Sequence, residues 1–202
     1  SLFFCFYNAV SNGFVDYSPI EGLSFRTSVS ASVSDRTTGD YRGTFTKSQK
    51  TTRLPKVNQQ TFGRESITLD NTITYKMNSG DHDLTVTGLH SIFQQRDNSS
   101  RMDVQNLPYR SLWHHMGDGE ITNWETNFEE RALISYMGRV NYSFKDKYLL
   151  TLTGRSDGAS QLSDGNKWQF FPSVAFAWRL GDEEFIKNTN LFSDLKLRVS
   201  YG

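Results

Sequence analysis

The chain has 202 residues, and its 22 basic and 22 acidic residues balance, which gives no indication of a nucleic-acid partner. Aromatic residues make up 14% of the chain, yet its mean hydropathy of −0.57 is typical of proteins in water. No apolar run approaches the roughly 20 residues that a membrane-spanning helix needs, which excludes a helical membrane protein. Cys5 is the single cysteine, so neither an internal disulfide nor a cysteine metal cluster is expected.

Apolar and polar side chains alternate along much of the chain, as in β-strands that have one apolar and one polar face. The clearest case is 23–34, where mostly apolar residues at odd positions oppose serines and Arg26 at even positions. In chain order, the alternation predicts eight strands, at about 8–17, 23–34, 66–77, 83–94, 134–143, 148–155, 168–180 and 196–201.

The connections between these strands alternate in length. Short turns are expected at 18–22, 78–82 and 145–147, and a longer connection at 181–194 should contain one helical turn at 181–186. Long polar loops are expected at about 35–64, 96–130 and 157–167. Short turns at one end and long loops at the other predict an all-β fold, an antiparallel up-and-down transmembrane β-barrel whose short turns face the periplasm.

Aromatic spacing supports a membrane-spanning sheet. Trp168 and Trp178 lie ten residues apart on one face of one strand, which is roughly 33 Å of strand and roughly 25 Å of height after tilting by ~40°. That height matches the apolar band of an outer-membrane barrel, and aromatic rings favour both edges of such a band. The predicted girdle residues are Tyr75, Tyr142, Tyr148, Trp168 and Trp178.

Two glycines fall on the predicted lipid-facing side. A three-residue turn at 145–147 would set Gly138 directly opposite Gly154, where neighbouring rings could fill the gap.

Five sequence blocks between 133 and 202 carry a family resemblance. They read YMGRVNYSFKDKYLLT (136–151), RSDGAS (155–160), WQFFPSVA (168–175), WRL (178–180) and LKLRVSYG (195–202). In this order they resemble the SusC/RagA-like TonB-linked (TonB-dependent) outer-membrane transporters of Bacteroidetes. The strand–turn–strand at 16–26 is also similar to that family, whereas 35–64 and 96–130 match no part of it.

The resemblance implies that 1–202 form part of a single barrel domain in the bacterial cell outer membrane, about eight strands of a 22-stranded barrel. The family's plug and TonB box are not visible in this sequence. The resemblance implies active uptake of oligosaccharides or peptides, energised by the TonB–ExbB–ExbD complex through a missing N-terminal region. It also implies a SusD-like surface lipoprotein as a lid and contact with outer-membrane lipid. No cofactor is implied.

No enzyme motif is present: the chain lacks Gly-x-Ser-x-Gly, a phosphate-binding glycine loop and His-Glu-x-x-His, so no enzymatic activity is expected. His114 and His115, followed by Asp118 and Glu120, resemble metal ligands. Adjacent histidines on an extended loop point apart, however, and an ordinary polar loop is the favoured interpretation.

Candidate contact residues lie in the segment 108–124. Exposed aromatic rings bind sugar faces or partner surfaces, so the candidates for substrate or lid contact are Tyr109, Trp113, His114 and Trp124. Packing of these rings against each other is an equally good interpretation.

Basic side chains on the predicted lumen side form a second candidate set. Arg26, Arg139, Arg155, Arg179 and Arg198 could pair with an acidic plug surface or attract an anionic substrate. A solvated lumen wall of mixed charge is the favoured alternative.

Two other protein classes fit part of the pattern. A soluble β-sandwich that binds carbohydrate or acts as an adhesin would turn its apolar faces inward, but its strands are usually only about 5–6 residues long. A passive porin would share the strand pattern, and only the family blocks favour an active transporter over it.

Overall fold

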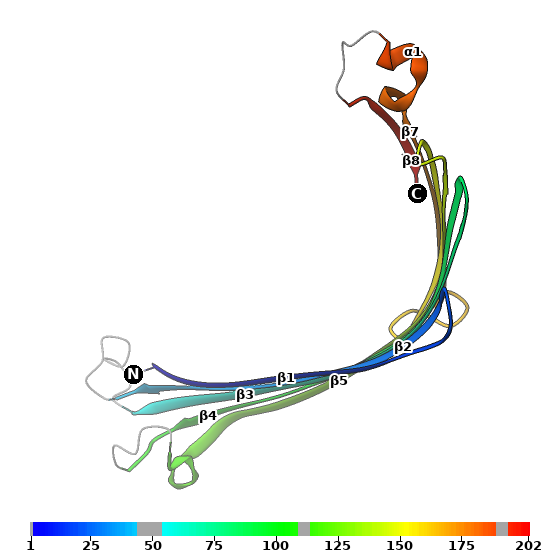
Figure 1. The fold of residues 1–202 in the computed structure, drawn as a ribbon. Helices are drawn as coiled ribbons and strands as arrows, with labels where there is room; N and C mark the ends of the chain where they lie inside the picture. The colour runs from blue at the N-terminus through cyan, green and yellow to red at the C-terminus, as the bar shows by residue number, and fades with distance from the viewer. Residues whose placement is uncertain (1, 44–53, 109–113, 189–193) are drawn as a thin grey trace. The chain divides into compact units, whose positions relative to one another are not determined.

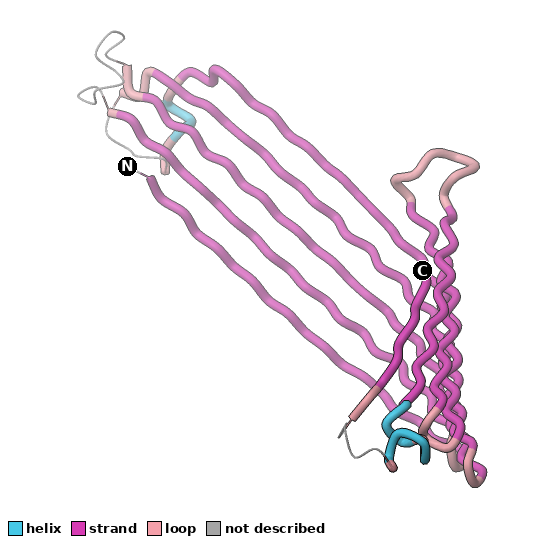
Figure 2. The backbone as a smooth tube through the Cα atoms, turned by 90° about the horizontal axis from the view of Figure 1, so that it is seen from above, coloured by secondary structure: helices cyan, strands magenta, loops and turns pink. Residues whose placement is uncertain are grey.

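A computed structural model describes residues 2–43, 54–108, 114–188 and 194–202. In this part of the chain, eight strands form one sheet in which each strand pairs with the next in chain order (Figure 1). The strands are β1 (Leu2–Ile20), β2 (Leu23–Arg42), β3 (Lys56–Ser79), β4 (His82–Gln105), β5 (Glu120–Phe144), β6 (Tyr148–Ala159), β7 (Trp168–Arg179) and β8 (Lys196–Tyr201). The predicted up-and-down β-barrel segment is confirmed, because no strand crosses over another (Figure 2).

The chain divides into two compact units, and each contains stretches of several strands. The first unit comprises Ser1–Ser11, Ser30–Ile67 and Gln94–Arg131, and the second comprises Asn12–Val29, Thr68–Phe93 and Ala132–Gly202. The second unit contains all the short turns that connect the strands.

The short turns are where the sequence predicts them. Residues 21–22, 80–81 and 145–147 connect the strands. Lys145 (φ 53°) and Asp146 (φ 54°) adopt the left-handed conformation at both central positions of a tight hairpin turn, which Lys147 N–H closes by donating to the Phe144 carbonyl at 3.0 Å. The predicted helical turn is also present: a 3₁₀ turn, η3 (Leu180–Asp182), and the short helix α1 (Glu184–Lys187) connect β7 to β8.

Two of the predicted loops are much shorter than expected. β2 continues to Arg42 and β3 begins at Lys56, so most of 35–64 is strand; likewise β4 and β5 occupy most of 96–130. The third, 157–167, shortens only to 160–167. In the first unit both faces of the sheet carry polar side chains, so the alternation disappears while the backbone ladder continues.

The second unit keeps its apolar side chains on an exposed face. Gly138 pairs with Gly154, as predicted, and the neighbouring registers bring Val140, Leu152 and Val174 together. Among the described residues, the buried hydrophobic side chains are Val57, Val104, Leu107 and Met116, and all of them lie in the first unit. A β-sandwich would bury the apolar face against a second sheet. That alternative interpretation of the sequence is therefore wrong.

No helix among the described residues has the length and apolar character required to cross a membrane.

Candidate functional site

A hollow of about 670 Å³ lies on the polar face of the first unit. Four strands line it, and most of the lining comes from residues two apart on each strand: Arg36 and Thr38, Gln60 and Phe62, Ser99 and Arg101, Glu125 and Asn127. Thr61, Ser100 and Thr126 between them complete the lining. Phe62 is 37% exposed and is the aromatic ring of this lining. The hollow therefore combines one exposed ring with charged and amide side chains, which are the groups that bind sugars and peptides.

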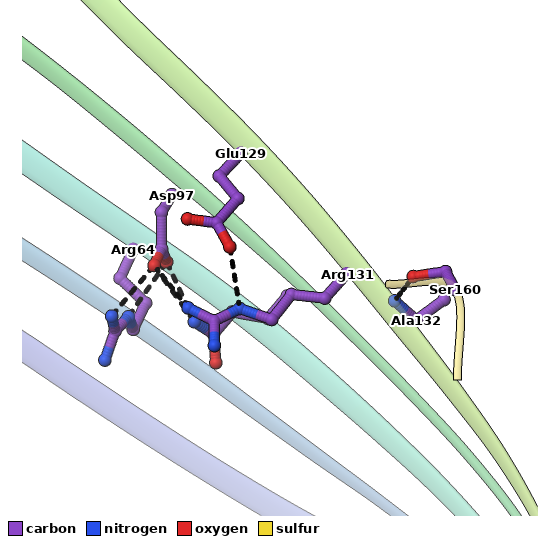
Figure 3. Close-up of polar contacts among 7 residues, drawn as sticks. Arg64, Asp97, Glu129, Arg131, Ala132 and Ser160 are labelled. Carbon is purple, nitrogen blue, oxygen red and sulfur yellow. Dashed lines mark hydrogen bonds and ion pairs between the residues drawn. The ribbon is translucent and has the colours of Figure 1, made fainter. Parts of the chain in front are cut away.

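Arg64 on β3, Asp97 on β4, and Glu129 and Arg131 on β5 form an ionic cluster (Figure 3). Arg64 donates two hydrogen bonds to Asp97, at 2.9 and 2.8 Å, and Arg131 donates a third at 3.2 Å. Gln95 also donates to Asp97, which is only 9% exposed. The Arg64 guanidinium lies over the Phe62 ring at 5.3 Å, so Asp97 holds Arg64 where it supports that ring.

The same cluster sets the charge of its carboxylate. The hydrogen bonds from Arg64 hold the pKa of Asp97 below its usual value, against the opposing effect of burial. The Nε of Arg131 forms an ion pair with Glu129 at 3.7 Å rather than a hydrogen bond. No pattern in the sequence predicts this cluster, because its members are distant in the chain and Arg64, Asp97 and Glu129 lie in segments expected to be loops.

Of the aromatic contact candidates, the two that the structure describes, His114 and Trp124, do not line this hollow. Tyr109 and Trp113 lie outside the described residues, and His114 is exposed just before the 3₁₀ turn η2 (Met116–Asp118). Trp124 is 70% exposed but belongs to strand β5, so its expected place in a loop is wrong. Trp124 is not among the residues that line the hollow, although Glu125, Thr126 and Asn127 of the same strand are.

The basic candidates are only partly brought together. Arg26 pairs with Asp16 at 2.6 Å, Arg155 with Asp157 at 2.8 Å, and Arg139 donates to the Thr153 hydroxyl at 3.2 Å. Each of these three positive charges therefore has a local polar partner on its own or a neighbouring strand.

Arg179 and Arg198 differ from the other three. Arg179 is level with Lys196 on the paired strands β7 and β8, and Arg198 lies two residues further along β8. In the part of the chain that the structure describes, none of these three cations forms an ion pair. Of the five predicted basic residues, Arg179 and Arg198 are therefore the two whose side chains have no polar partner in this part of the chain.

Three of the five girdle candidates, Tyr148, Trp168 and Trp178, belong to two stacks of rings in the second unit. We call His82, Phe144, Tyr148 and Trp178 the turn-side ladder, whose neighbouring centroids lie 4.9, 6.3 and 5.9 Å apart. We call His90, Tyr136 and Trp168 the loop-side ladder, with centroids 5.0 and 6.0 Å apart. Tyr142, a fourth girdle candidate, stacks on His82 of the turn-side ladder with centroids 6.0 Å apart, and its hydroxyl lies 2.7 Å from His82 Nδ1. The fifth candidate, Tyr75 on β3, is not a member of either ladder as defined.

The carboxylate of Glu183 anchors the turn-side ladder. It accepts hydrogen bonds from Trp178 Nε1 at 3.1 Å, Tyr148 Oη at 2.8 Å and Lys147 Nζ at 3.2 Å. These bonds, the one from Trp178 foremost, hold the pKa of Glu183 below its usual value. The sequence predicts the helical turn at 181–186, but it contains no signal that Glu183 in this turn ties two hairpins together.

No three His, Cys, Asp or Glu side chains gather into a possible metal site among the residues that the structure describes.

The chain is similar in sequence to several transport receptors, although no protein-family model matches it. It is 33% identical over 208 positions to TonB-dependent receptor P26 of Formosa agariphila, a match that covers 96% of this chain and 20% of the relative. It is 50% identical over 85 positions to TonB-dependent receptor SusC of Bacteroides thetaiotaomicron, covering 42% of this chain and 8% of that receptor. The chain thus spans at most about a fifth of the length of these relatives.

The fold is similar to that of a solved transporter. The structure of the RagAB peptide transporter matches 98% of this chain and 23% of the solved chain, with a TM-score of 0.88 at 23% identity. At that identity the match supports the fold, and the fold agrees with the sequence relatives.

The Glu183 contacts predict a loss of stability in acid. Because the folded-state pKa lies below that of a glutamate in an unfolded chain, about 4.3, the ionised carboxylate stabilises the fold fully above that value. This contribution is lost as the pH falls through the lower, folded-state pKa. Glu183→Gln should therefore lower the urea midpoint at neutral pH, and the difference from the unmodified protein should shrink in acid. The neighbouring Glu184→Gln is the control, and a constant difference at all pH values would contradict the assignment.

The Asp97 cluster predicts a large effect from a small change. Asp97→Asn leaves Arg64 and Arg131 without their shared carboxylate, and we expect a loss of about 1–3 kcal/mol in the free energy of unfolding. Asp164 pairs with Lys167 at 2.8 Å but its side chain is 96% exposed, so Asp164→Asn should change stability by less than about 0.5 kcal/mol. Similar effects of the two substitutions in urea unfolding would show that the Asp97 cluster is not stabilising.

Proposed function

Because this chain belongs to the SusC/RagA-like TonB-dependent receptors, we propose that its protein actively imports nutrients across the bacterial outer membrane. The observation that supports this most strongly is the second unit's exposed apolar face, bounded by an aromatic ladder on each side. Trp168 and Trp178 are at opposite ends of β7, about 33 Å apart along the strand, which is about 25 Å along the axis of a barrel whose strands tilt by ~40°. Exposing such a face to water costs free energy, whereas contact with the hydrocarbon core of a membrane does not.

The relatives favour an energised importer over a passive porin. P26 and SusC are named TonB-dependent receptors, which supports coupling of this protein to the TonB–ExbB–ExbD complex. SusC and RagAB likewise support a partner similar to a SusD-like surface lipoprotein. The solved neighbour is a peptide transporter, so the proposed substrates are peptides or oligosaccharides.

The polar hollow of the first unit is the proposed substrate-contact surface. Phe62 offers a ring face for stacking on a sugar or an apolar side chain, and Gln60 and Asn127 offer donors and acceptors for hydroxyl or peptide groups. Arg101 and Glu125 provide both signs of charge, which favours neutral or zwitterionic substrates over strongly anionic ones. Tyr109, Trp113, His114 and Trp124 remain proposed contacts to a lid or substrate.

Uptake by whole cells tests the proposal. Import of the substrate, identified from panels of peptides and oligosaccharides, should stop when TonB is deleted or the proton-motive force is collapsed, because a closed barrel needs energy to open. Uptake that continues unchanged under both treatments would contradict active import and favour the porin.

The same assay locates the contact surface. Phe62→Ala should reduce uptake by about tenfold, the effect of losing one stacking contact, while barrel assembly, measured by resistance to SDS, stays intact. Phe128→Ala is the matched control, because Phe128 is an exposed phenylalanine of β5 that does not line the hollow. Uptake lost only in Trp124→Ala would instead support the aromatic lid contact, and full uptake with Phe62→Ala would remove the hollow from the proposal.

A further inference from the structure

A second hollow, of about 720 Å³, lies in the apolar face of the second unit. Its floor is a row of glycines on three neighbouring strands. Gly138 pairs with Gly154, and counting along β4 and β5 from the hydrogen bond of Lys145 N–H to the Asp81 carbonyl sets Gly88 level with Gly138. A Cβ atom added at Gly138 would meet no atom within 4 Å, so this part of the floor is open.

Bulky side chains enclose this floor at both sides. At Gly88 an added Cβ would lie 2.9 Å from Ile73 Cγ2, and at Gly154 it would lie 3.2 Å from the ring of Phe170. Phe25, which also lines the hollow, extends the wall on the side of Ile73. The result is an apolar groove about three strands wide.

A row of polar side chains borders the groove. On each strand it lies two residues from the glycine row, a step of about 6.6 Å. Thr27, Asn71, His90, Tyr136 and Ser156 make up this polar row, and all five line the hollow. Tyr136 pairs with Ser156 and stacks on His90 with a centroid distance of 5.0 Å. The next row is apolar again, with Ile134 opposite Gly158 and Gly158 opposite Trp168.

The polar row has hydrogen-bonding capacity to spare. The Thr27 hydroxyl donates to the Asn71 carbonyl oxygen at 3.0 Å, which leaves both N–H groups of the Asn71 amide for a partner. Within the described residues no acceptor satisfies them. A primary amide in contact with hydrocarbon costs several kcal/mol unless it is hydrogen-bonded, so the polar row calls for a partner that carries an acceptor.

We propose that this groove binds one membrane lipid, whose acyl chain lies on the glycine floor and whose ester or amide carbonyl accepts from Asn71. The linkage region of a lipid is the place where carbonyl acceptors directly adjoin an apolar chain, as the polar row directly adjoins the glycine floor. A free hydrocarbon chain would leave the amide unsatisfied, and a water-soluble ligand would not fit an apolar floor. The inference rests on the proposed function only in that this face contacts the membrane.

Native mass spectrometry of the full-length receptor tests the proposal, with phosphatidylethanolamine titrated into detergent micelles as the probe lipid. One lipid should remain bound at high collision energy in the unmodified receptor. Gly138→Leu, which fills the floor, should abolish this retention. Gly13→Leu is the matched control, since Gly13 also has open space around its Cβ but does not line the groove.

Asn71→Leu distinguishes specific binding of one lipid from non-specific contact between lipid and an apolar face. Under the proposal it should weaken lipid retention by about tenfold, the effect of one lost hydrogen bond. Equal retention by Asn71→Leu, Gly138→Leu and the unmodified receptor would overturn the proposal, as would a second protein chain retained in place of lipid. SDS resistance confirms that each variant is folded. Uptake is measured separately, so a failure of lipid binding and a failure of transport are distinguishable.

Discussion

Every backbone N–H and C=O group that enters hydrocarbon needs a partner within the protein, and this constraint explains most of the structure. Between β1 and β8 the sheet satisfies it by pairing each strand with the next, through registers such as Tyr148 with Trp178, while the outer edges of β1 and β8 have no partner strand among the described residues. Pairing in a single sheet leaves both faces uncovered, so the apolar side chains of the second unit stay exposed rather than forming a core. Under the proposed function, the surrounding lipid takes the place of that core.

The two faces of the sheet then carry different chemistry. On the polar face of the first unit, Asp97 holds Arg64 beside Phe62, at the edge of a hollow suited to a polar substrate. On the apolar face of the second unit, rings stack into two ladders, and Glu183 fixes one of them to the connection between β7 and β8. Within each unit, the two-residue period of the strands separates the side chains of one face from those of the other.

Sequence patterns predict the features that depend on local chemistry or on one hairpin. The turn at 145–147, the pairing of Gly138 with Gly154 and the helical turn before β8 are of this kind. The extension of β2 to β5 into the first unit could not be predicted, because side chains that are polar on both faces give no period. The Asp97 cluster, and the alignment of Gly88 with Gly138, depend on the register between strands whose residues are far apart in the chain. The same missing period explains why Trp124 falls in an expected loop rather than in β5.

The most direct test of the account is the side-chain environment along β7, measured by spin labels at single cysteines in a cysteine-free receptor reconstituted in lipid. Labels at Phe170, Val174 and Phe176 should be accessible to oxygen, which dissolves in hydrocarbon, and protected from a water-soluble nickel complex. Labels at Phe171, Ser173 and Ala175 should show the reverse, although Phe171 is itself apolar, because the register places it on the polar face. Accessibility to nickel at all six positions, without a two-residue period, would contradict a membrane-facing sheet.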